Sequence, residues 1–295
     1  MSVATPAPTP PRKADGFALR LPATLLGAAV GPRTQAIDAR WLMAYAAGLG
    51  ETDPRYFDTG AASGPLAHPL FAVCYEWPLA VELRETVIGD AIAPFSVHAT
   101  HDLTIHRPPR AGDVLSTSAR VVEVRPVKAG SLVVVKLETV DAQGAPITTT
   151  RYGSIYRGVG CDGDAGNAPP RPAPPGAVGW EEPVDVGAGL AHVYTECSRI
   201  WNPIHTDIAV ARAAGLPGLI LHGTATLALA VSRVIRRDLA GAPAHVRGVT
   251  VRFTGMVPLP STFTVRGRGA SHAEVHFDAV DAAGRPVLHG GVVRR

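Results

Sequence analysis

The chain has 295 residues, of which 46% are hydrophobic and 18% are charged, and its formal net charge is only +3. This composition is typical of a globular protein large enough for one large domain or two ordinary ones. The small net charge argues against a nucleic-acid partner but leaves room for an anionic ligand such as coenzyme A. The chain has three cysteines, none of them in a CxxC pair. They indicate no disulfide framework and favour a cytoplasmic setting.

The first residues show no pattern of a packed element. Residues 1–15 combine four prolines with small and polar residues, which predicts a disordered tail. They lack the apolar stretch of a secretory signal. Because no run of about 18 apolar residues occurs in the chain, no membrane span and no membrane partner are expected.

The first half reads as helices followed by strands. Residues 37–49 carry apolar side chains at helical spacing, with Asp38 as the N-cap. An apolar run at 71–87 predicts a long helix interrupted near Pro78. Alternating or valine-rich segments then predict strands at residues 96–106, 114–124, 132–140 and 147–156.

The second half repeats this order. After a long apolar helix that begins at Gly223, strands are predicted at residues 245–253, 262–267, 273–280 and 287–293. The turn at 280–286 echoes the one at 140–146. The pattern predicts an α+β protein made by tandem duplication, with copies at 16–158 and 180–295. Prolines and glycines at 159–179 predict an exposed linker.

A short motif in the second copy carries the chemistry. Asn202 and Pro203 are helix-start signals, and Asn202 is expected to cap the turn that presents His205. Downstream, Gly223 opens the long helix, where its N–H lies near the positive end of the helix dipole. A basic imidazole and a backbone donor together suit thioester chemistry. The base moves a proton, and the donor stabilises the carbonyl oxygen as it gains charge.

This stretch resembles the hydratase-2 motif of MaoC-like (R)-specific enoyl-CoA hydratases and dehydratases. The matching residues are Tyr194, Asn202, Pro203, His205, His222 and Gly223. The sequence departs from the motif at two positions, where Arg199 replaces a glycine and Ile200 replaces the catalytic aspartate. In the family that aspartate and the histidine together hold the attacking water, which Ile200 cannot do. The resemblance implies a double hotdog, in which two antiparallel sheets each wrap around a long helix.

The resemblance also implies roles for individual residues. His205, Gly223 and Asn202 are the expected catalytic residues. The residues expected to contact substrate lie beside them in the sequence: Ser198, Ile200, Trp201, His222 and Thr224. No metal and no cofactor are expected, since the substrate itself is an acyl-CoA or an acyl carrier protein thioester. The first copy, which lacks the motif, is expected to provide room for the acyl chain.

Two further groups of residues stand out in the sequence. His98, His101 and His106 lie close together, but strand alternation puts His101 on the opposite face, and no set of cysteines or carboxylates accompanies them. Packed or solvated histidines are therefore expected. Glu51 holds the position in the first copy that Ile200 holds in the second, which raises a minor hypothesis that Glu51 assists His205.

The expected function is reversible hydration of a trans-2-enoyl thioester to the (R)-3-hydroxyacyl thioester by a lyase, which the change at Ile200 leaves impaired or repurposed. Two alternatives stay open, a non-catalytic acyl-CoA-binding protein and a hotdog thioesterase. A double hotdog already pairs two copies within one chain, so either a monomer or a homodimer of double hotdogs is compatible with the sequence.

Overall fold

The computed structural model describes residues 12–13, 16–162 and 176–295. The first half contains four short or edge strands, two helices and then a run of longer strands. These are β1 (Arg12–Lys13), β2 (Gly16–Phe17), β3 (Leu19–Leu21), β4 (Ala29–Ala36), α1 (Ala39–Gly48), α2 (Ala72–Leu83), β5 (Ser96–Ile105), β6 (Val114–Val127), β7 (Gly130–Val140), β8 (Pro146–Arg157) and β9 (Val159–Cys161).

The second half repeats this order of elements. It consists of β10 (Trp180–Val186), α3 (Leu190–Ser198), α4 (Ile208–Ala213), α5 (Gly223–Asp238), β11 (Gly248–Phe253), β12 (Ser261–Ala270), β13 (Glu274–Asp281) and β14 (Pro286–Arg294). The duplicated α+β organisation predicted from the sequence is therefore confirmed.

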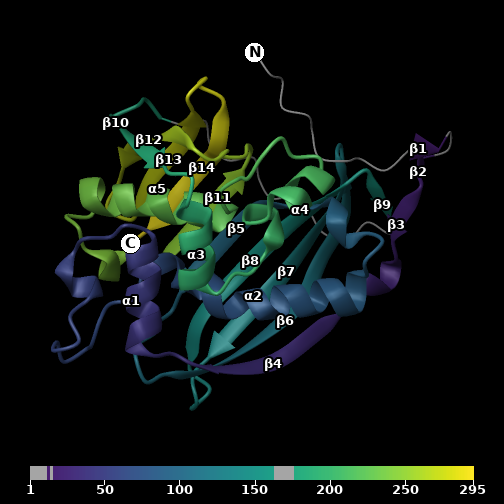
Figure 1. The fold of residues 1–295 in the computed structure, drawn as a ribbon. Coiled ribbons are helices and arrows are strands. Elements are labelled where there is room, and N and C mark those ends of the chain that lie inside the picture. Colours follow the sequence, from purple (N-terminus) through teal and green to yellow (C-terminus); the bar gives the residue numbers. More distant parts are fainter. Residues whose placement is uncertain (1–11, 14–15, 163–175) are drawn as a thin grey trace.

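The strands of both halves form one continuous antiparallel sheet of ten strands, in the order β10-β12-β13-β14-β11-β5-β8-β7-β6-β4. The halves meet where β11 pairs with β5, from Gly248 opposite Thr104 to Arg252 opposite Thr100. Figure 1 shows α2 lying across the strands of the first half and α5 across those of the second. The two sheets expected from the sequence are thus joined edge to edge.

The core is also shared between the halves. Ten residues of α5 are buried, and the eight apolar ones pack in one cluster with buried residues of α1, α2, α3 and both parts of the sheet. Each fully buried Leu, Val or Phe side chain contributes about 1.5–3 kcal/mol, so this cluster is the main force that holds the two halves together.

Helices α1 and α3 pack against each other as equivalent elements of the two copies. The hydroxyls of Tyr45 and Tyr194 approach to 3.4 Å. A Cβ added at Gly48 would lie 2.8 Å from the Cβ of Cys197, so the close approach of the helices requires glycine there. Asp38 caps α1 as predicted, since its side chain accepts a hydrogen bond from the N–H of Trp41 at 2.7 Å.

Some predictions about secondary structure were wrong. Helix α2 runs through Pro78 without a break, because the packing of its buried face outweighs one lost backbone hydrogen bond. Strands β4 and β10 were missed; both lie at sheet edges, where polar residues and prolines are tolerated.

The predicted tail and linker fall largely outside the described residues, at 1–11, 14–15 and 163–175. Two described parts of them form strands. Residues Arg12–Lys13 pair with β2, and Val159–Cys161 pair with β3. Val159 is fully buried, so the start of the predicted exposed linker belongs to the core of the first half.

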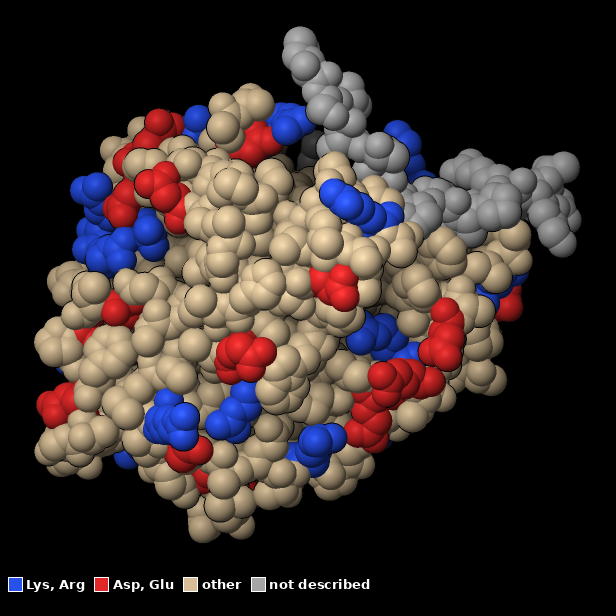
Figure 2. Space-filling model, in the orientation of Figure 1, with Lys and Arg blue, Asp and Glu red and all other residues tan. Residues whose placement is uncertain are grey.

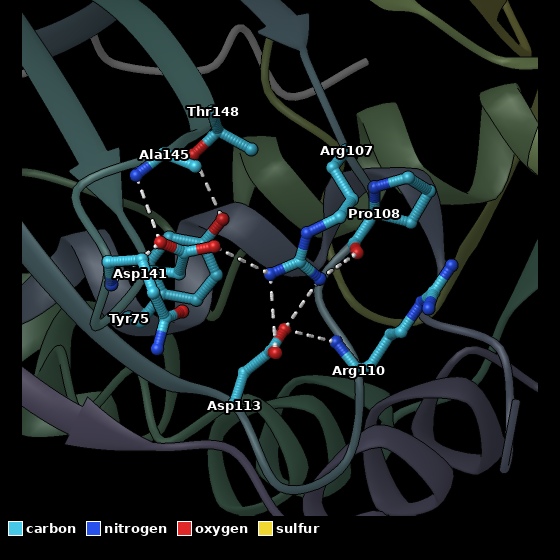
Figure 3. Close-up of polar contacts among 9 residues, drawn as sticks. Tyr75, Arg107, Pro108, Arg110, Asp113, Asp141, Ala145 and Thr148 are labelled. Atoms are coloured by element: carbon cyan, nitrogen blue, oxygen red, sulfur yellow. Dashed lines mark hydrogen bonds and ion pairs between the residues drawn. The ribbon is translucent and has the colours of Figure 1, made fainter.

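Arg107, just after β5, ties two loops at one end of the sheet together. Its guanidinium lies 2.9 Å from a carboxylate oxygen of Asp113 and 3.5 Å from one of Asp141, in the β7–β8 turn. In Figure 3 the hydroxyls of Tyr75 on α2 and Thr148 on β8 meet beside this group, at 2.9 Å. These contacts fix the position of α2 relative to the sheet.

Charged side chains are mixed on the surface. Figure 2 shows acidic and basic residues interspersed over the helical face, and Arg236 and Arg237 of α5 both pair with Glu182. Within the described ranges, no helix is both long and apolar enough to cross a membrane.

Candidate functional site

The site begins where α3 ends. Arg199 follows α3 with a φ of 61°, in the left-handed region that favours glycine. The backbone therefore keeps the turn of the motif although the glycine is replaced. The Arg199 guanidinium lies 4.0 Å from the centre of the Trp41 ring, a cation–π contact that offsets part of the backbone strain.

The next turn presents His205. Residues Pro203–His205 form one 3₁₀ turn, and the carbonyl of Asn202 accepts a hydrogen bond from the His205 N–H at 3.1 Å. Asn202 holds the N-cap position, but its side chain makes no capping hydrogen bond. The predicted cap is therefore wrong, and the amide is left available to a ligand because Asn202 lines the pocket described below.

The His205 ring is held in one orientation. Its Nδ1–H donates to the carbonyl of Ile220 at 2.9 Å, which leaves the lone pair on Nε2. Burial lowers the pKa of His205 to about 4, although the hydrogen bond to Ile220 opposes the shift. The imidazole is therefore neutral near pH 7, with Nε2 able to accept a proton.

His222 supports this ring from behind. The two imidazole rings stack with centroids 3.8 Å apart, and the Nε2 atom of His222 lies 3.2 Å from the hydroxyl of Thr195. Burial, followed by the neighbouring His205, lowers the pKa of His222 to about 2. A neutral, buried partner of this kind orients His205 without adding a competing charge.

Gly223 is the first residue of α5, and the first N–H groups of a helix have no partner within it. They can therefore donate to a ligand oxygen at the positive end of the helix dipole. A Cβ at this position would lie 3.3 Å from the Phe253 ring, so glycine lets that ring pack close to the start of α5.

One pocket contains these groups, with about 1470 Å³ of space including its open mouth. Six of the eight expected site residues line it, namely Ile200, Asn202, His205, His222, Gly223 and Thr224. Ile200, which occupies the position of the motif's aspartate, is buried in the wall with 3% of its surface exposed. The pocket continues across the β5–β11 junction to residues of α2 and β5.

Ser198 and Trp201 do not line this pocket. The Ser198 hydroxyl is fully buried and donates to the carbonyl of Tyr194 at 2.6 Å, inside α3. Trp201 is 61% exposed. Both were expected from their proximity in sequence, but the left-handed turn at Arg199 sends neighbouring side chains in different directions.

Glu51 belongs to the first copy's own equivalent of the site. Its carboxylate lies 3.9 Å from Nε2 of His68, and it does not line the pocket around His205. The hypothesis that Glu51 assists His205 is therefore wrong. Glu51 and His205 are separated because the duplication places the equivalent positions of the two copies at different points of the sheet.

The far wall of the pocket holds polar residues that the sequence did not assign to the site. They are Glu76 on α2, His98 and His101 on β5 and Tyr152 on β8. An irregularity in the pairing of β5 with β8 between His98 and Thr100 brings His98 and His101 together, with ring centroids 5.5 Å apart. The prediction that His98 and His101 lie on opposite faces of the strand was wrong because of this irregularity.

Comparisons with known protein families agree with this geometry. Residues 173–287 match the MaoC like domain, and residues 24–150 match the FAS1-like dehydratase domain region. The chain carries a MaoC-like domain. The MaoC-like domain includes the Asn202–His205 turn, α5 and the strands that follow.

Similar proteins include two curated relatives. The peroxisomal multifunctional enzyme type 2 of Drosophila melanogaster is 30% identical over 154 residues, which are 50% of this chain and 25% of that protein. The peroxisomal enoyl-CoA hydratase 2 of Arabidopsis thaliana is 40% identical over 53 residues, or 18% of this chain and 17% of that protein. The chain thus spans a quarter or less of the length of these relatives.

Solved structures share the fold. A MaoC-like dehydratase from Phytophthora capsici superposes with a TM-score of 0.79 at 24% identity, covering 92% of this chain and 95% of the other. A protein of Mycobacterium tuberculosis described as a double hotdog superposes with a TM-score of 0.58 at 18% identity, covering 91% of this chain and 95% of the other. The expected double hotdog is confirmed.

Proposed function

We propose that the protein is an acyl-thioester hydratase or dehydratase that interconverts a trans-2-enoyl thioester and its 3-hydroxyacyl form. The single observation that carries the proposal is that a neutral imidazole with a free Nε2, at His205, lines the same pocket as the start of α5, at Gly223. The name of the Arabidopsis relative, enoyl-CoA hydratase 2, supports the same reaction.

The proposed mechanism uses one base and one donor. The Gly223 N–H donates a hydrogen bond to the thioester carbonyl and transfers no proton. This hydrogen bond stabilises the enolate as negative charge moves onto the carbonyl oxygen. Nε2 of His205 removes a proton from water while the water oxygen bonds to C3. The imidazolium then delivers that proton to C2, so addition occurs on one face. Dehydration is the reverse sequence.

Ile200 determines how fast this reaction runs. With no carboxylate at that position, His205 alone handles both the water and the proton, and we expect a rate below that of a site with both groups by about two to four orders of magnitude. If the rate is too low to measure, the pocket serves to bind an acyl thioester without turning it over. The buried Ile200 is the observation that favours this second candidate.

The reaction as proposed needs no cofactor, and the thioester of CoA or of an acyl carrier protein is its substrate. We further propose that the chain divides into copies at 16–158 and 180–295 and acts in the cytoplasm, as a monomer or as a homodimer of double hotdogs. The first copy would supply the acyl-binding room, since the pocket extends to α2 and β5.

The test is incubation with a panel of trans-2-enoyl-CoAs and 3-hydroxyacyl-CoAs, followed by mass. A gain or loss of one water that disappears in His205→Ala supports the proposal. Release of free thiol from saturated acyl-CoA would identify a thioesterase instead. Saturable binding with neither reaction would identify the non-catalytic candidate.

A further inference from the structure

The part of the pocket proposed to bind the acyl chain contains more buried polar side chains than a hydrocarbon chain requires. His101 is 1% exposed, and neither of its ring nitrogens has a hydrogen-bond partner among the described residues. A buried polar group left without a partner costs about 1–3 kcal/mol. The cost is recovered when a ligand supplies the missing hydrogen bond.

Glu76 faces the same space from α2. One of its carboxyl oxygens accepts a hydrogen bond from the Thr150 hydroxyl at 2.6 Å, and the side chain is buried and lines the pocket. Thr150 lies two residues before Tyr152 on β8, on the same face of the sheet, and Tyr152 is directly opposite His101. The carboxyl and imidazole groups therefore converge on one region of the pocket.

This region lies next to the proposed reaction centre. The Phe253 ring is 3.3 Å from the position that a Gly223 Cβ would take, and its centroid is 4.3 Å from that of His98. His98 stacks on Tyr152 at 3.9 Å, and its Nε2–H donates to the Thr100 carbonyl at 3.1 Å. Its position is therefore fixed, and one aromatic ring separates the start of α5 from the polar region.

We propose that the acyl group accepted by this pocket carries a neutral oxygen substituent, a hydroxyl or a carbonyl, a few carbons beyond C3, and that His101 and Glu76 bind it. This inference rests on the proposed function, because it assigns the acyl part of the same thioester. A neutral imidazole offers one donor and one acceptor, and a protonated carboxyl offers a donor, so together they match a hydroxyl or a carbonyl.

The electrostatics of the region favour a neutral substituent over a carboxylate. Burial raises the pKa of Glu76 to about 7 and lowers the pKa of His101 to about 4. Both shifts disfavour charge, as expected where groups are removed from water. A carboxylate placed here would lose its hydration and meet a second carboxyl group.

The test compares saturated acyl-CoAs of equal chain length by calorimetric titration, one plain and the others hydroxylated at successive carbons beyond C4. Saturated chains are not hydrated, so binding is measured without turnover. The best hydroxylated ligand is expected to bind about tenfold more tightly than the plain one. His101→Leu is expected to bring this ratio to about one without weakening the binding of the plain chain.

Two variants of Glu76 distinguish the loss of a hydrogen-bonding group from a general folding defect. Glu76→Leu should also remove the preference, whereas Glu76→Gln should retain it, since an amide keeps both a donor and an acceptor. The matched control is His106→Leu. His106 follows β5 directly but is exposed and contacts Thr149 outside the pocket, so the preference should be unchanged.

The results separate this inference from the proposed function. Hydration of plain enoyl-CoAs with no preference for any hydroxylated ligand would overturn the polar subsite alone. A hydroxyl preference that His101→Leu removes, with no hydration of any enoyl-CoA, would support the subsite and overturn the hydratase. Tighter binding of a terminally carboxylated chain than of every hydroxylated chain would overturn the neutral substituent.

Discussion

Replacing Ile200 by Asp should restore a missing part of the hydratase site. Ile200 is in the wall of the pocket that contains His205. A positioned acid–base group contributes typically 10²–10⁴-fold in rate, equivalent to about 3–5 kcal/mol of barrier. We therefore expect Ile200→Asp to raise the rate of hydration by at least about 100-fold.

The same change has a cost in stability that the structure sets. Ile200 is only 3% exposed, so its replacement removes about 1.5–3 kcal/mol of apolar burial. Placing a polar side chain there adds about 1–3 kcal/mol. The matched control is Ile200→Asn, which has nearly the same shape as the aspartate variant and should lose similar stability, but cannot act as an acid or a base.

The assay is the loss of conjugated absorbance of a trans-2-enoyl-CoA, with product mass as confirmation. A carboxylate near His205 should raise its pKa above about 4, so the acidic limb of the pH–rate profile should move to higher pH. If folded Ile200→Asp is no faster than Ile200→Asn, the pocket does not hold water at His205 and the reasoning fails.

Three other predictions follow from the site. His205→Ala should lower hydration by about 10²–10⁴-fold, because no other base lies on the motif turn; single-turnover rates check this. Gly223→Ala should lower kcat/KM with an intact fold, since its Cβ would lie 3.3 Å from the Phe253 ring, which lines the same pocket. Burial raises the pKa of Glu76 from its ordinary value of 4.5 to about 7, so the folded state holds a proton that the unfolded state releases. Relative to Glu76→Gln, the free energy of unfolding should fall by about 3 kcal/mol as pH rises from 4.5 to 7 and stay level above; urea titrations at several pH values measure it.

Each of these has a control. His205→Gln should be as slow as His205→Ala, since an amide cannot take up the proton. Gly218→Ala should be neutral, because nothing lies within 4 Å of a Cβ there. An unfolding free energy that keeps a constant offset from Glu76→Gln across this pH range would show that Glu76 is charged when folded.

Much of the fold could be predicted because local and global signals agree in it. The turns at Asp141 and Asp281 have the same hydrogen-bonded form, and each follows a strand in its copy. Residues with alternating apolar side chains became β5 to β8 and β11 to β14, with ends shifted by a few residues. The edge strands β4 and β10 were missed because each has a neighbouring strand on one side only. Such strands tolerate polar residues and prolines, so the alternation of apolar residues is weaker in them.

Only the part of the site formed by the motif residues could be predicted from the sequence. Asn202, His205 and Gly223 line one pocket, and a motif places them because local turns hold them. The opposite wall depends on which residues of the first copy meet the second across the β5–β11 junction, a long-range pairing with no local pattern. The glutamate at position 76, in the middle of an apolar stretch, was an available signal, since a buried carboxyl in such a stretch needs a reason.

The junction between the copies has a consequence for how such a protein can evolve. The groups proposed for chemistry come from one repeat, whereas much of the surface that meets the acyl chain comes from the other, more than a hundred positions earlier in the sequence. Substitutions in the earlier repeat can therefore change the range of substrates while the reaction itself is preserved. Duplication gave this chain two parts that selection can adjust separately.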